Sequence, residues 1–312
     1  MEKTLPGRRA SLVWHRLTWL FRGKGAERSQ ARWAYVFLSV SVLGLLIFSI
    51  LPIIAAFGLG FVQWTLLSPP KWAGLANFRK LLSDKYFWNA LKNTLYYVAG
   101  VMPGIAISLF LAVLLNQKVR FTTLYRTLFY LPTITMWTAI ALVWKWLYSP
   151  RYGLINWGLG LIGIAGPAWL SDPLWAMPAQ IFTSWWKGAG YNMLIFLAGL
   201  QGIPQIYYEA SSIDGANWWQ RFRNVTIPLL TPTIYFVVVM TFIGSFGVFS
   251  QIYIMTEGGP GQATTTLIYY VYTNAFKYFE IGYADVLAVA FFIVVFTFTL
   301  IQTRLQKRWV HY

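Results

Sequence analysis

Long apolar segments alternate with shorter polar ones along most of this chain. Six apolar segments dominate the pattern, at residues 34–61, 94–115, 128–148, 176–200, 231–254 and 283–301. An apolar stretch of about 20 residues forms a helix long enough to cross the hydrocarbon core of a bilayer. Helix breakers such as Pro103 in the second segment are tolerated where neighbouring helices satisfy the freed backbone groups. The pattern predicts an all-α membrane protein with six transmembrane helices.

The composition agrees with a membrane protein. Hydrophobic residues make up 57% and charged residues 11% of the 312 residues, whereas roughly 25% of the residues in soluble domains are charged. Aromatic residues reach 19%, and many of the 17 tryptophans stand at the edges of apolar segments. Tryptophan and tyrosine rings prefer the membrane–water interfaces. A soluble domain with a very apolar core is therefore disfavoured.

The distribution of charge along the chain indicates its orientation in the membrane. The formal net charge is +16, and eight of the 25 basic residues lie within residues 1–33. The polar segments on the side of the two termini carry 16 basic residues, and those on the other side carry 7. Cytoplasmic loops of membrane proteins are enriched in Lys and Arg. Both termini are therefore predicted to be cytoplasmic, and no nucleic-acid partner is expected.

Three regions follow from this pattern: a basic N-terminal tail (1–33), a transmembrane domain (34–303) and a short C-terminal tail (304–312). Residues 11–21 form either an amphipathic helix on the membrane surface or part of a disordered tail, and the sequence does not decide between them. A short helix is expected near Thr264–Phe276, in the last polar segment on the outer side.

The sequence contains few of the residue patterns that are typical of catalytic or metal sites. Cysteine does not occur, and the two histidines, His15 and His311, stand near opposite ends, so thiolate and histidine metal sites are not expected. The P-loop pattern GxxxxGK[ST] is lacking, since Gly23-Lys24 is followed by Gly25. Paired carboxylates and a nucleophile triad are also lacking. The chain is predicted to be no enzyme and to bind no cofactor or metal.

The polar loop 201–230 contains residues that typically begin and end helices. Pro204 is suited to the start of a helix, where its missing N–H is not needed. Gly215 is suited to the end of that helix, because glycine readily adopts the left-handed C-cap conformation. Asn217 can cap a second short helix from Trp218 to Asn224, which the next proline would close. The loop is predicted to form a helical hairpin on the cytoplasmic side.

The same loop carries a family resemblance. Glu209 and Gly215 are six residues apart, and Val225-x-Ile227-Pro228 follows. This spacing resembles the EAA loop of binding-protein-dependent ABC importers, the cytoplasmic element that the ATPase subunit contacts. Other segments resemble the carbohydrate-importer permeases of the maltose and glycerol-phosphate family, namely Arg126–Pro132, Asn192–Pro204 and Tyr253–Thr264. The resemblance covers about residues 33–312 and departs from the EAA pattern in three conservative changes, Ser211, Val225 and Ile227.

The resemblance implies a type I ABC importer permease arrangement with a cytoplasmic EAA coupling helix. It assigns contacts with the ATPase subunit to Glu209, Ala210, Asp214, Gly215, Arg221, Arg223 and Pro228. Gly215 would be the turn that lets the hairpin dock in a cleft of the ATPase. For the two arginines, simple retention of positive charge on the cytoplasmic side is an equally good interpretation.

The resemblance also implies a substrate pathway near the membrane midplane. Its candidate lining residues are Trp186, Lys187, Gly190, Tyr191, Asn192, Ser245, Phe246, Phe249 and Gln251. Aromatic rings stack on the apolar faces of sugars, and amides and hydroxyls bind sugar hydroxyl groups. Each of these residues could instead serve helix packing through small and polar contacts. Lys187 is a functional candidate as an intramembrane charge, or a snorkelling residue that extends to the interface.

A permease of this family implies defined partners. The resemblance implies a second homologous permease subunit, two copies of an ATPase subunit that bind ATP and Mg, and an extracytoplasmic solute-binding protein that delivers a sugar or oligosaccharide. This chain would bind no cofactor itself. It would be a multi-pass protein of the bacterial or archaeal plasma membrane, in contact with lipid.

Two alternatives remain open at this point. The first is import of glycerol phosphate or another polyol by the same machinery. A phosphate would favour arginine in the pocket, and Lys145 and Lys187 are the cations within the predicted spans, so a neutral sugar is preferred. The second is a solitary secondary transporter or channel. Ion coupling would need intramembrane acids, and of the nine acidic residues Asp285 alone falls within a predicted span.

Overall fold

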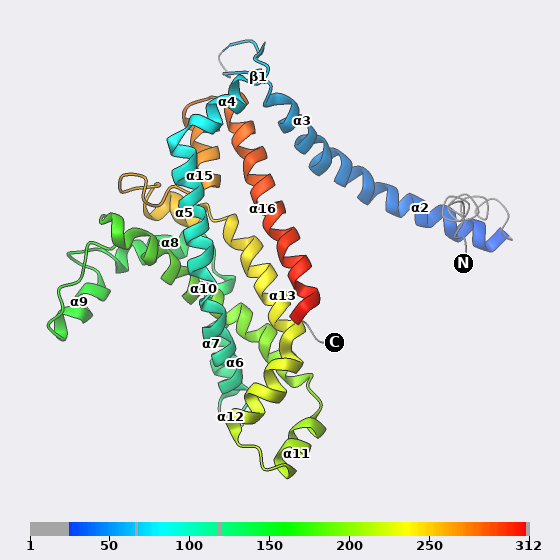
Figure 1. The fold of residues 1–312 in the computed structure, drawn as a ribbon, viewed down its shortest axis with the longest axis vertical. Coiled ribbons are helices and arrows are strands. Elements are labelled where there is room, and N and C mark those ends of the chain that lie inside the picture. Colours follow the sequence, from blue (N-terminus) through cyan, green and yellow to red (C-terminus); the bar gives the residue numbers. More distant parts are fainter. Residues whose placement is uncertain (1–24, 66–67, 118–119, 310–312) are drawn as a thin grey trace, which may run out of the picture. The chain divides into compact units, whose positions relative to one another are not determined.

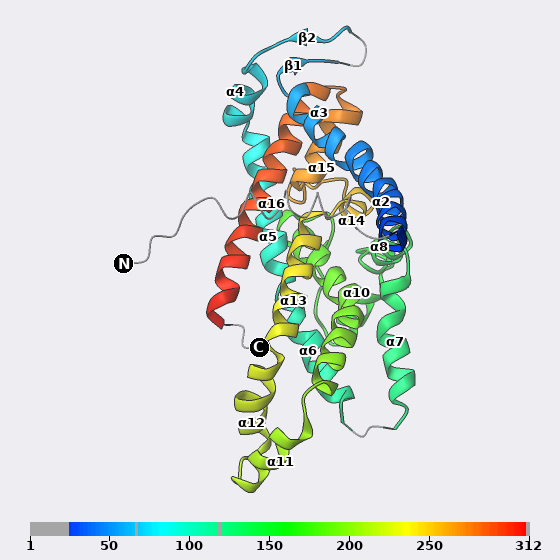
Figure 2. The same cartoon turned by 90° about the vertical axis from the view of Figure 1, so that its right-hand side faces the viewer.

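The protein is mostly helical in the computed structural model, which describes residues 25–65, 68–117 and 120–309 (Figures 1 and 2). The segment at residues 11–21, for which an amphipathic helix and a disordered tail were the alternatives, lies outside the described residues. The chain forms two units, residues 1–58 and 59–312.

The first unit is built on one long helix that contains a π-helical turn. α2 (Gly25–Leu45) continues through the π-helical segment Leu46–Ile50 into α3 (Leu51–Leu59). At the junction the N–H of Leu51 donates to the carbonyl of Leu46, five residues back. Pro52 follows directly. Proline lacks an N–H and its ring clashes with the carbonyl four residues earlier, so the widened turn lets the helix pass the proline.

The second unit begins with a small hairpin and continues with helices. β1 (Val62–Gln63) and β2 (Lys71–Trp72) pair antiparallel, with Val62 opposite Trp72. The main helices are α4 (Ala76–Ser83), α5 (Lys85–Val101), α6 (Gly104–Leu115), α7 (Thr122–Ile134), α8 (Trp137–Leu147), α9 (Leu154–Leu161), α10 (Pro173–Gln201), α13 (Ile227–Phe246) and α16 (Ile281–Trp309). Shorter helices are α11 (Gln205–Ile213), α12 (Trp218–Arg221), α14 (Ser250–Met255) and α15 (Leu267–Tyr272).

Within this unit α5–α6, α10, α13 and α16 run roughly along one direction, as Figure 1 shows. The hairpin and α4 lie at one end, called the hairpin end, and α11 and α12 lie at the opposite end. α6, α10 and α13 share an apolar core that includes Ala112, Met193, Phe196, Leu230 and Val237. A separate apolar cluster joins α5, α15 and α16 near the hairpin end, through Phe87, Leu267 and Leu287 among others.

Several helices are suited to crossing a membrane. Four among the described residues are long and apolar enough, at Arg32–Leu59, Lys85–Leu115, Trp218–Phe246 and Ile281–Gln306, and the bent pair α7–α8 would make a fifth. α10, which contains the predicted span 176–200, has 29 residues but does not pass the same test. Its polar side chains are buried inside the protein, among them Gln180, Ser184 and Lys187, so α10 is less apolar than a helix that faces lipid.

Two predicted spans are interrupted. The segment predicted as one span at residues 128–148 is bent by 99° between α7 and α8. Pro132 removes an N–H from the last turn of α7, and Thr135 and Met136 are extended at ψ 139° and 140°. The segment 231–254 is divided as well, because α13 ends at Phe246 and α14 begins at Ser250. The short helix expected near Thr264–Phe276 is present as α15 with the π-helical segment Thr273–Lys277.

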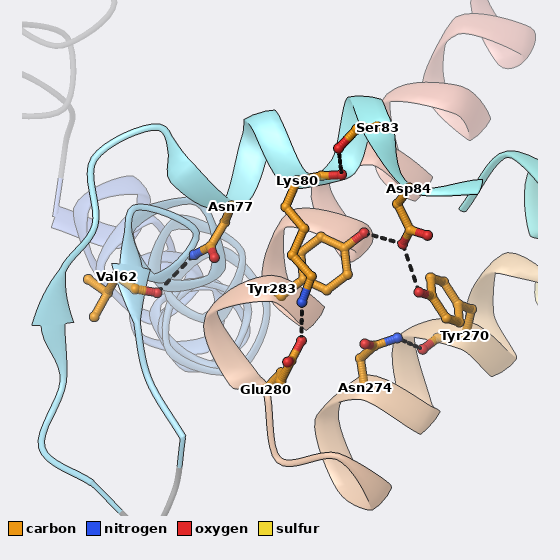
Figure 3. Close-up of polar contacts among 9 residues, drawn as sticks. All are labelled: Val62, Asn77, Lys80, Ser83, Asp84, Tyr270, Asn274, Glu280 and Tyr283. Atoms are coloured by element: carbon orange, nitrogen blue, oxygen red, sulfur yellow. Dashed lines mark hydrogen bonds and ion pairs between the residues drawn. The ribbon is translucent and has the colours of Figure 1, made fainter. Parts of the chain in front are cut away.

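Polar contacts connect distant segments at the hairpin end (Figure 3). Asn77 Nδ2 donates to the carbonyls of Gly60 and Val62, each at 3.0 Å. Lys80 forms an ion pair with Glu280, and its Nζ lies 4.1 Å from the centre of the Tyr283 ring. These contacts attach α4 both to the hairpin and to the start of α16.

Asp84 is the centre of a second set of contacts at this end (Figure 3). It caps α5 by accepting the N–H of Tyr86 at 2.8 Å, and its other oxygen accepts the hydroxyls of Tyr270 and Tyr283. Partial burial raises the pKa of the Asp84 carboxyl, but the hydrogen bonds from Tyr283 and Tyr270 outweigh burial and hold the pKa below its ordinary value of 3.8. The ionised carboxylate therefore connects α5, α15 and α16.

Candidate functional site

The loop 201–230 forms two short helices at the end of the unit opposite the hairpin (Figure 1). Residues 204–226 are called the knob. α11 begins directly after Pro204 and ends at Ile213. Gly215 has a φ of +75°, and its N–H donates to Ser212 O at 3.1 Å, while Ala216 N–H donates to Ser211 O at 2.9 Å. This pair of bonds is a Schellman C-cap, so the predicted start and end of the first helix are confirmed.

The second helix of the knob begins as predicted and ends differently. Asn217 Oδ1 accepts the N–H of Gln220 at 2.9 Å, and the Gln220 side chain accepts the N–H of Asn217 at 2.8 Å. This reciprocal capping box starts α12. The prediction that Pro228 closes a separate short helix is wrong: the helix runs on through the π-helical segment Phe222–Thr226 into α13. The N–H of Ile227 donates five residues back to Phe222 O, which makes room for the proline.

Bonds within the knob hold its two helices together. The hydroxyls of Tyr208 and Thr226 are 3.1 Å apart, and Arg221 Nη1 donates to Ser212 Oγ at 3.1 Å. The rings of Trp218 and Phe222 are stacked with centres 5.5 Å apart. Most of the predicted coupling residues are solvent-exposed, namely Glu209, Ala210, Asp214, Gly215 and Arg223, and Arg221 and Pro228 are half-buried. The knob thus presents charged and small residues to solvent on a compact support.

A cleft of about 400 Å³ lies between the helices in the middle of the unit. α5–α6, the α7–α8 bend, α10 and α13 all contribute to its wall. Four of the predicted pathway residues line it: Lys187, Tyr191, Asn192 and Ser245. Its other lining residues include Tyr97, Ser108, Thr133, Trp137, Ser184 and Thr241. Hydroxyls, amides and aromatic rings therefore surround one space.

The other predicted pathway residues lie elsewhere. Trp186 packs against Trp144, with ring centres 5.4 Å apart. Gly190 is a close helix contact, since a Cβ there would lie 1.9 Å from the carbonyl oxygen of Phe129. Phe246 is 1% exposed and packs in the core against neighbouring phenylalanines. These three residues are not among those that line the cleft. Gly190 and Phe246 pack between helices, whereas Trp186 is 44% exposed.

Phe249 and Gln251 line a smaller cavity of about 110 Å³, to which Tyr97 and Trp137 also contribute. Because Tyr97 and Trp137 line the main cleft as well, the two cavities share part of their walls. Phe249 stands among tyrosines, with its ring centre 4.9 Å from that of Tyr272.

A buried polar network supports the cleft. Tyr97 Oη and Ser184 Oγ are 2.7 Å apart, and Ser184 donates to Gln251 Oε1 at 2.9 Å. Gln251 Nε2 donates in turn to the carbonyl of Gln180 at 2.6 Å. Sequence reasoning did not single out Tyr97, Ser184 or Gln180. A detectable signal existed on α10, because Gln180, Ser184 and Tyr191 recur at helical spacing within an apolar segment.

Lys187 does not snorkel. Its side chain is 7% exposed, and Nζ donates to the carbonyls of Pro132, Thr133 and Thr135 at 2.9, 3.2 and 2.7 Å. The Trp137 ring centre lies 4.9 Å from Nζ. The ammonium group has three donors, and the last turn of α7 and its C-cap accept all three.

The described residues offer no candidate metal site. Within the part of the chain that the structure describes, no group of three or more His, Cys, Asp or Glu side chains is positioned to hold a metal ion. The described polar residues of the cleft are instead neutral, apart from Lys187.

Comparisons with known proteins give consistent results. The sequence model of the family described as binding-protein-dependent transport system inner membrane component matches residues 101–311. The probable ABC transporter permease protein YesP of Bacillus subtilis (strain 168) is 41% identical over 284 residues, which are 89% of this chain and 91% of that protein. The lactose transport system permease protein LacF of Rhizobium radiobacter is 37% identical over 239 residues, covering 74% of this chain and 80% of LacF.

A solved structure is similar as well. The crystal structure of a bacterial ABC transporter involved in the import of the acidic polysaccharide alginate contains a chain that matches with a TM-score of 0.79 at 25% identity. The match covers 90% of this chain and 96% of that chain. The helical arrangement described above is therefore that of a known membrane transporter subunit.

Proposed function

The chain belongs to the binding-protein-dependent transport system inner membrane component family, and from this premise we propose that it forms half of the membrane channel of an ATP-driven importer for a neutral sugar or oligosaccharide. The cleft between α5–α6, α7–α8, α10 and α13 is the proposed pathway. The observation that carries the proposal is this polar, aromatic cleft in the same unit as an exposed EAA-type knob.

The membrane arrangement is the first part of the proposal. The four long apolar helices and the bent pair α7–α8, together with α10, would give six crossings. Six crossings place both termini on one side, and the excess of Lys and Arg assigns that side to the cytoplasm. The knob would then face the cytoplasm and the hairpin end would face outward.

Energy coupling is the second part. Glu209, Asp214 and Arg223 are exposed on the knob and available to an ATPase subunit. Knob movement with the ATPase would reorient the helices around the cleft, as in other alternating-access carriers. The chain would be non-catalytic, and the ATP and Mg would be bound by two ATPase copies. A second homologous permease and an extracytoplasmic solute-binding protein complete the proposed assembly.

The chemistry of the cleft supports a neutral substrate. Tyr191, Asn192 and Ser245 offer a ring, an amide and a hydroxyl, which suit the apolar faces and hydroxyl groups of a sugar. Lys187 is the cation among the described lining residues, and its three donors are engaged by backbone carbonyls. A phosphate or uronate would favour a free cation or an arginine fork. Relatives are named for different substrates, lactose in one case and acidic alginate in another, and the engaged lysine favours the neutral class here.

ATP hydrolysis by the reconstituted complex tests the coupling proposal. Glu209→Ala and Gly215→Pro should abolish hydrolysis stimulated by the solute-binding protein, while both variants still insert in the membrane. Leu142→Ala, an exposed apolar position on α8, is the control and should behave like the wild type. Sugar uptake without any ATPase partner would contradict the proposal. It would favour a solitary transporter, for which Asp285, the acid inside α16, would be the first residue to substitute.

A further inference from the structure

The bend between α7 and α8 leaves backbone carbonyls at the end of α7 without intrahelical hydrogen-bond donors. α7 ends at Ile134 and α8 begins at Trp137, at an angle of 99°. The last four carbonyls of a helix lack intrahelical partners. At membrane depth, water reaches such groups only where they line a cavity, so carbonyls that are buried in the protein need protein donors. The two arms of the bend contribute Thr133 and Trp137 to the cleft wall.

Side chains supply donors to three of these four carbonyls and to that of the C-cap residue Thr135. Thr135 Oγ1 donates to the carbonyl of Leu131 at 3.1 Å, and Lys187 donates to the carbonyls of Pro132, Thr133 and Thr135. Thr133 Oγ1 returns a bond to the carbonyl of Lys187 at 3.1 Å. The contact between α7 and α10 is thus bonded in both directions. The positive charge also lies at the C-terminal end of α7, where the helix dipole favours a cation.

Close packing allows Lys187 to reach these carbonyls. Gly190 lies against the backbone of α7 so tightly that a Cβ would be 1.9 Å from Phe129 O. One helical turn earlier on the same helix, the Lys187 side chain extends into the bend and is almost fully buried, at 7% exposure. A lysine that bound substrate would need at least one free donor, and all three are used here.

We propose that Lys187 is a positioning residue that fixes the α7–α8 bend, and with it the Thr133–Trp137 wall of the cleft, without binding the substrate. Its relevance to transport rests on the proposed function, whereas its effect on the bend does not. Without the ammonium group the carbonyls at the end of α7 lose their donors, and the angle between α7 and α8 changes or becomes heterogeneous. The cleft wall then no longer keeps one shape.

A distance across the bend tests this directly. The sequence contains no cysteine, so Leu128→Cys on α7 and Leu142→Cys on α8, both exposed, are the two spin-label sites of this chain, which is combined with partner subunits whose reactive cysteines have been replaced. The pair is introduced into the full complex in lipid nanodiscs, and the distance distribution is measured with and without Lys187→Met. We expect one narrow distribution with Lys187 and a shifted or broadened one with Lys187→Met. Lys187→Arg should stay close to the wild type, because it keeps charge-assisted donors.

Lys145 supplies a matched control. It is an exposed lysine on α8 whose Nζ donates to one carbonyl, that of Ile254, at 3.0 Å. Lys145→Met removes the same charge from the same region and should leave the α7–α8 distance unchanged. Sugar uptake at saturating substrate should fall roughly tenfold or more in Lys187→Met, since a charge-assisted bond contributes enough to change a rate by that factor. Lys187→Arg should recover most of the uptake.

Two results would overturn the proposal. An unchanged distance distribution in Lys187→Met, with uptake lost, would mean that Lys187 acts on the substrate. An unchanged distribution with uptake retained would mean that the lysine has no positioning role. If the Lys187→Met variant fails to assemble, Lys187→Gln is measured by the same criteria. Its amide keeps two N–H donors on a shorter, uncharged side chain. Because the distance needs no transport, failure of this inference is distinguishable from failure of the importer assignment.

Discussion

The two ends of the second unit are held together in opposite ways. At the hairpin end, the polar contacts join residues that are far apart in the sequence: 200 positions for Lys80 and Glu280, and 199 for Asp84 and Tyr283. In the knob, the bonds are local, with separations of 3 positions for Asn217 and Gln220 and 9 for Ser212 and Arg221. The hairpin end exists only when the whole unit is folded, whereas the knob is built almost entirely from its own residues.

This difference suits two mechanical roles. Long-range contacts couple the stability of a region to the global fold, while locally bonded segments open with smaller free energies. A rigid hairpin end would keep α4, α5, α15 and α16 in register. A self-contained knob, attached through α10 and α13, could move as one body. Substitutions at the hairpin end should therefore change global stability, and substitutions in the knob should change local opening and coupling.

The largest effect is expected for Gly282→Ala at the hairpin end. A Cβ at Gly282 would lie 1.9 Å from the backbone oxygen of Val62 and 3.2 Å from Asn77 Nδ2. Either the hairpin or α16 must move, and overpacking of this kind destabilises by about 1–3 kcal/mol. We expect the melting temperature of the purified complex to fall by several degrees, as followed by intrinsic fluorescence in detergent.

Gly215→Ala in the knob is the counterpart of that substitution. No atom lies within 4 Å of a Cβ at Gly215, but its φ is +75°, which costs about 1–2 kcal/mol for an L-residue. Because a locally bonded knob can relieve this strain by local opening, we expect a melting temperature close to that of the wild type and reduced coupling to ATP hydrolysis. A drop in melting temperature for Gly215→Ala as large as for Gly282→Ala would contradict the separation of the two ends.

An intermediate effect is expected for Asp84→Asn. The pKa of Asp84 is held below 3.8 in the folded protein, so its carboxylate stabilises the fold above the unfolded pKa, and this contribution is lost as the pH falls through the folded pKa. We expect a loss on the order of 1 kcal/mol near neutral pH, because the charge-assisted bonds are partly solvated. The side-chain oxygen of asparagine can still accept the N–H of Tyr86 and cap α5. The measured loss therefore reports on the hydrogen bonds from Tyr270 and Tyr283.

The pH dependence checks the sign of this prediction. The difference in melting temperature between wild type and Asp84→Asn should be constant from about pH 5 to 8 and should shrink below about pH 4. Lys71→Gln, at an exposed position of the hairpin, is the control and should show no such trend. A difference that grows at low pH would mean that Asp84 does not act as an ionised acceptor.

The contrast between the ends also explains what the sequence could predict. The helix start after Pro204, the left-handed Gly215 and the cap at Asn217 were predictable because each depends on neighbouring residues. The prediction that failed lies just after the knob: a break at Pro228 applied a local rule for proline to a helix that passes the proline by a π-helical turn. The same solution occurs at Pro52.

Features made by distant segments were not predictable in this way. Pro132 weakens the helix within the apolar run 128–148, but neither the 99° angle nor the donors that Lys187 supplies from another helix can be read from that run. The predicted pathway residues were consecutive or nearly consecutive residues of α10, of the end of α13 and of the start of α14. Consecutive residues of a helix point to different sides of it, so they cannot all face one cleft. Lys187, Tyr191 and Asn192 line the cleft, whereas the intervening Gly190 packs against α7. Which face meets the cleft is decided by packing against α7 and α13.

The smallest effect is expected for Asn217→Ala, and it tests the local character of the knob most closely. Loss of an N-cap costs about 1 kcal/mol, which corresponds to roughly a fivefold change in a local equilibrium. Amide hydrogen exchange in α12, residues 218–221, should accelerate by about that factor. Asn224→Ala, also at an exposed position of the knob, is the matched control and should leave exchange in α12 unchanged. Because the bonds of the knob are local, the hairpin-end helices α4 and α5 should keep wild-type exchange rates in both variants. If their exchange accelerates with that of α12, the knob is part of one cooperative unit with the hairpin end and cannot move as a separate body.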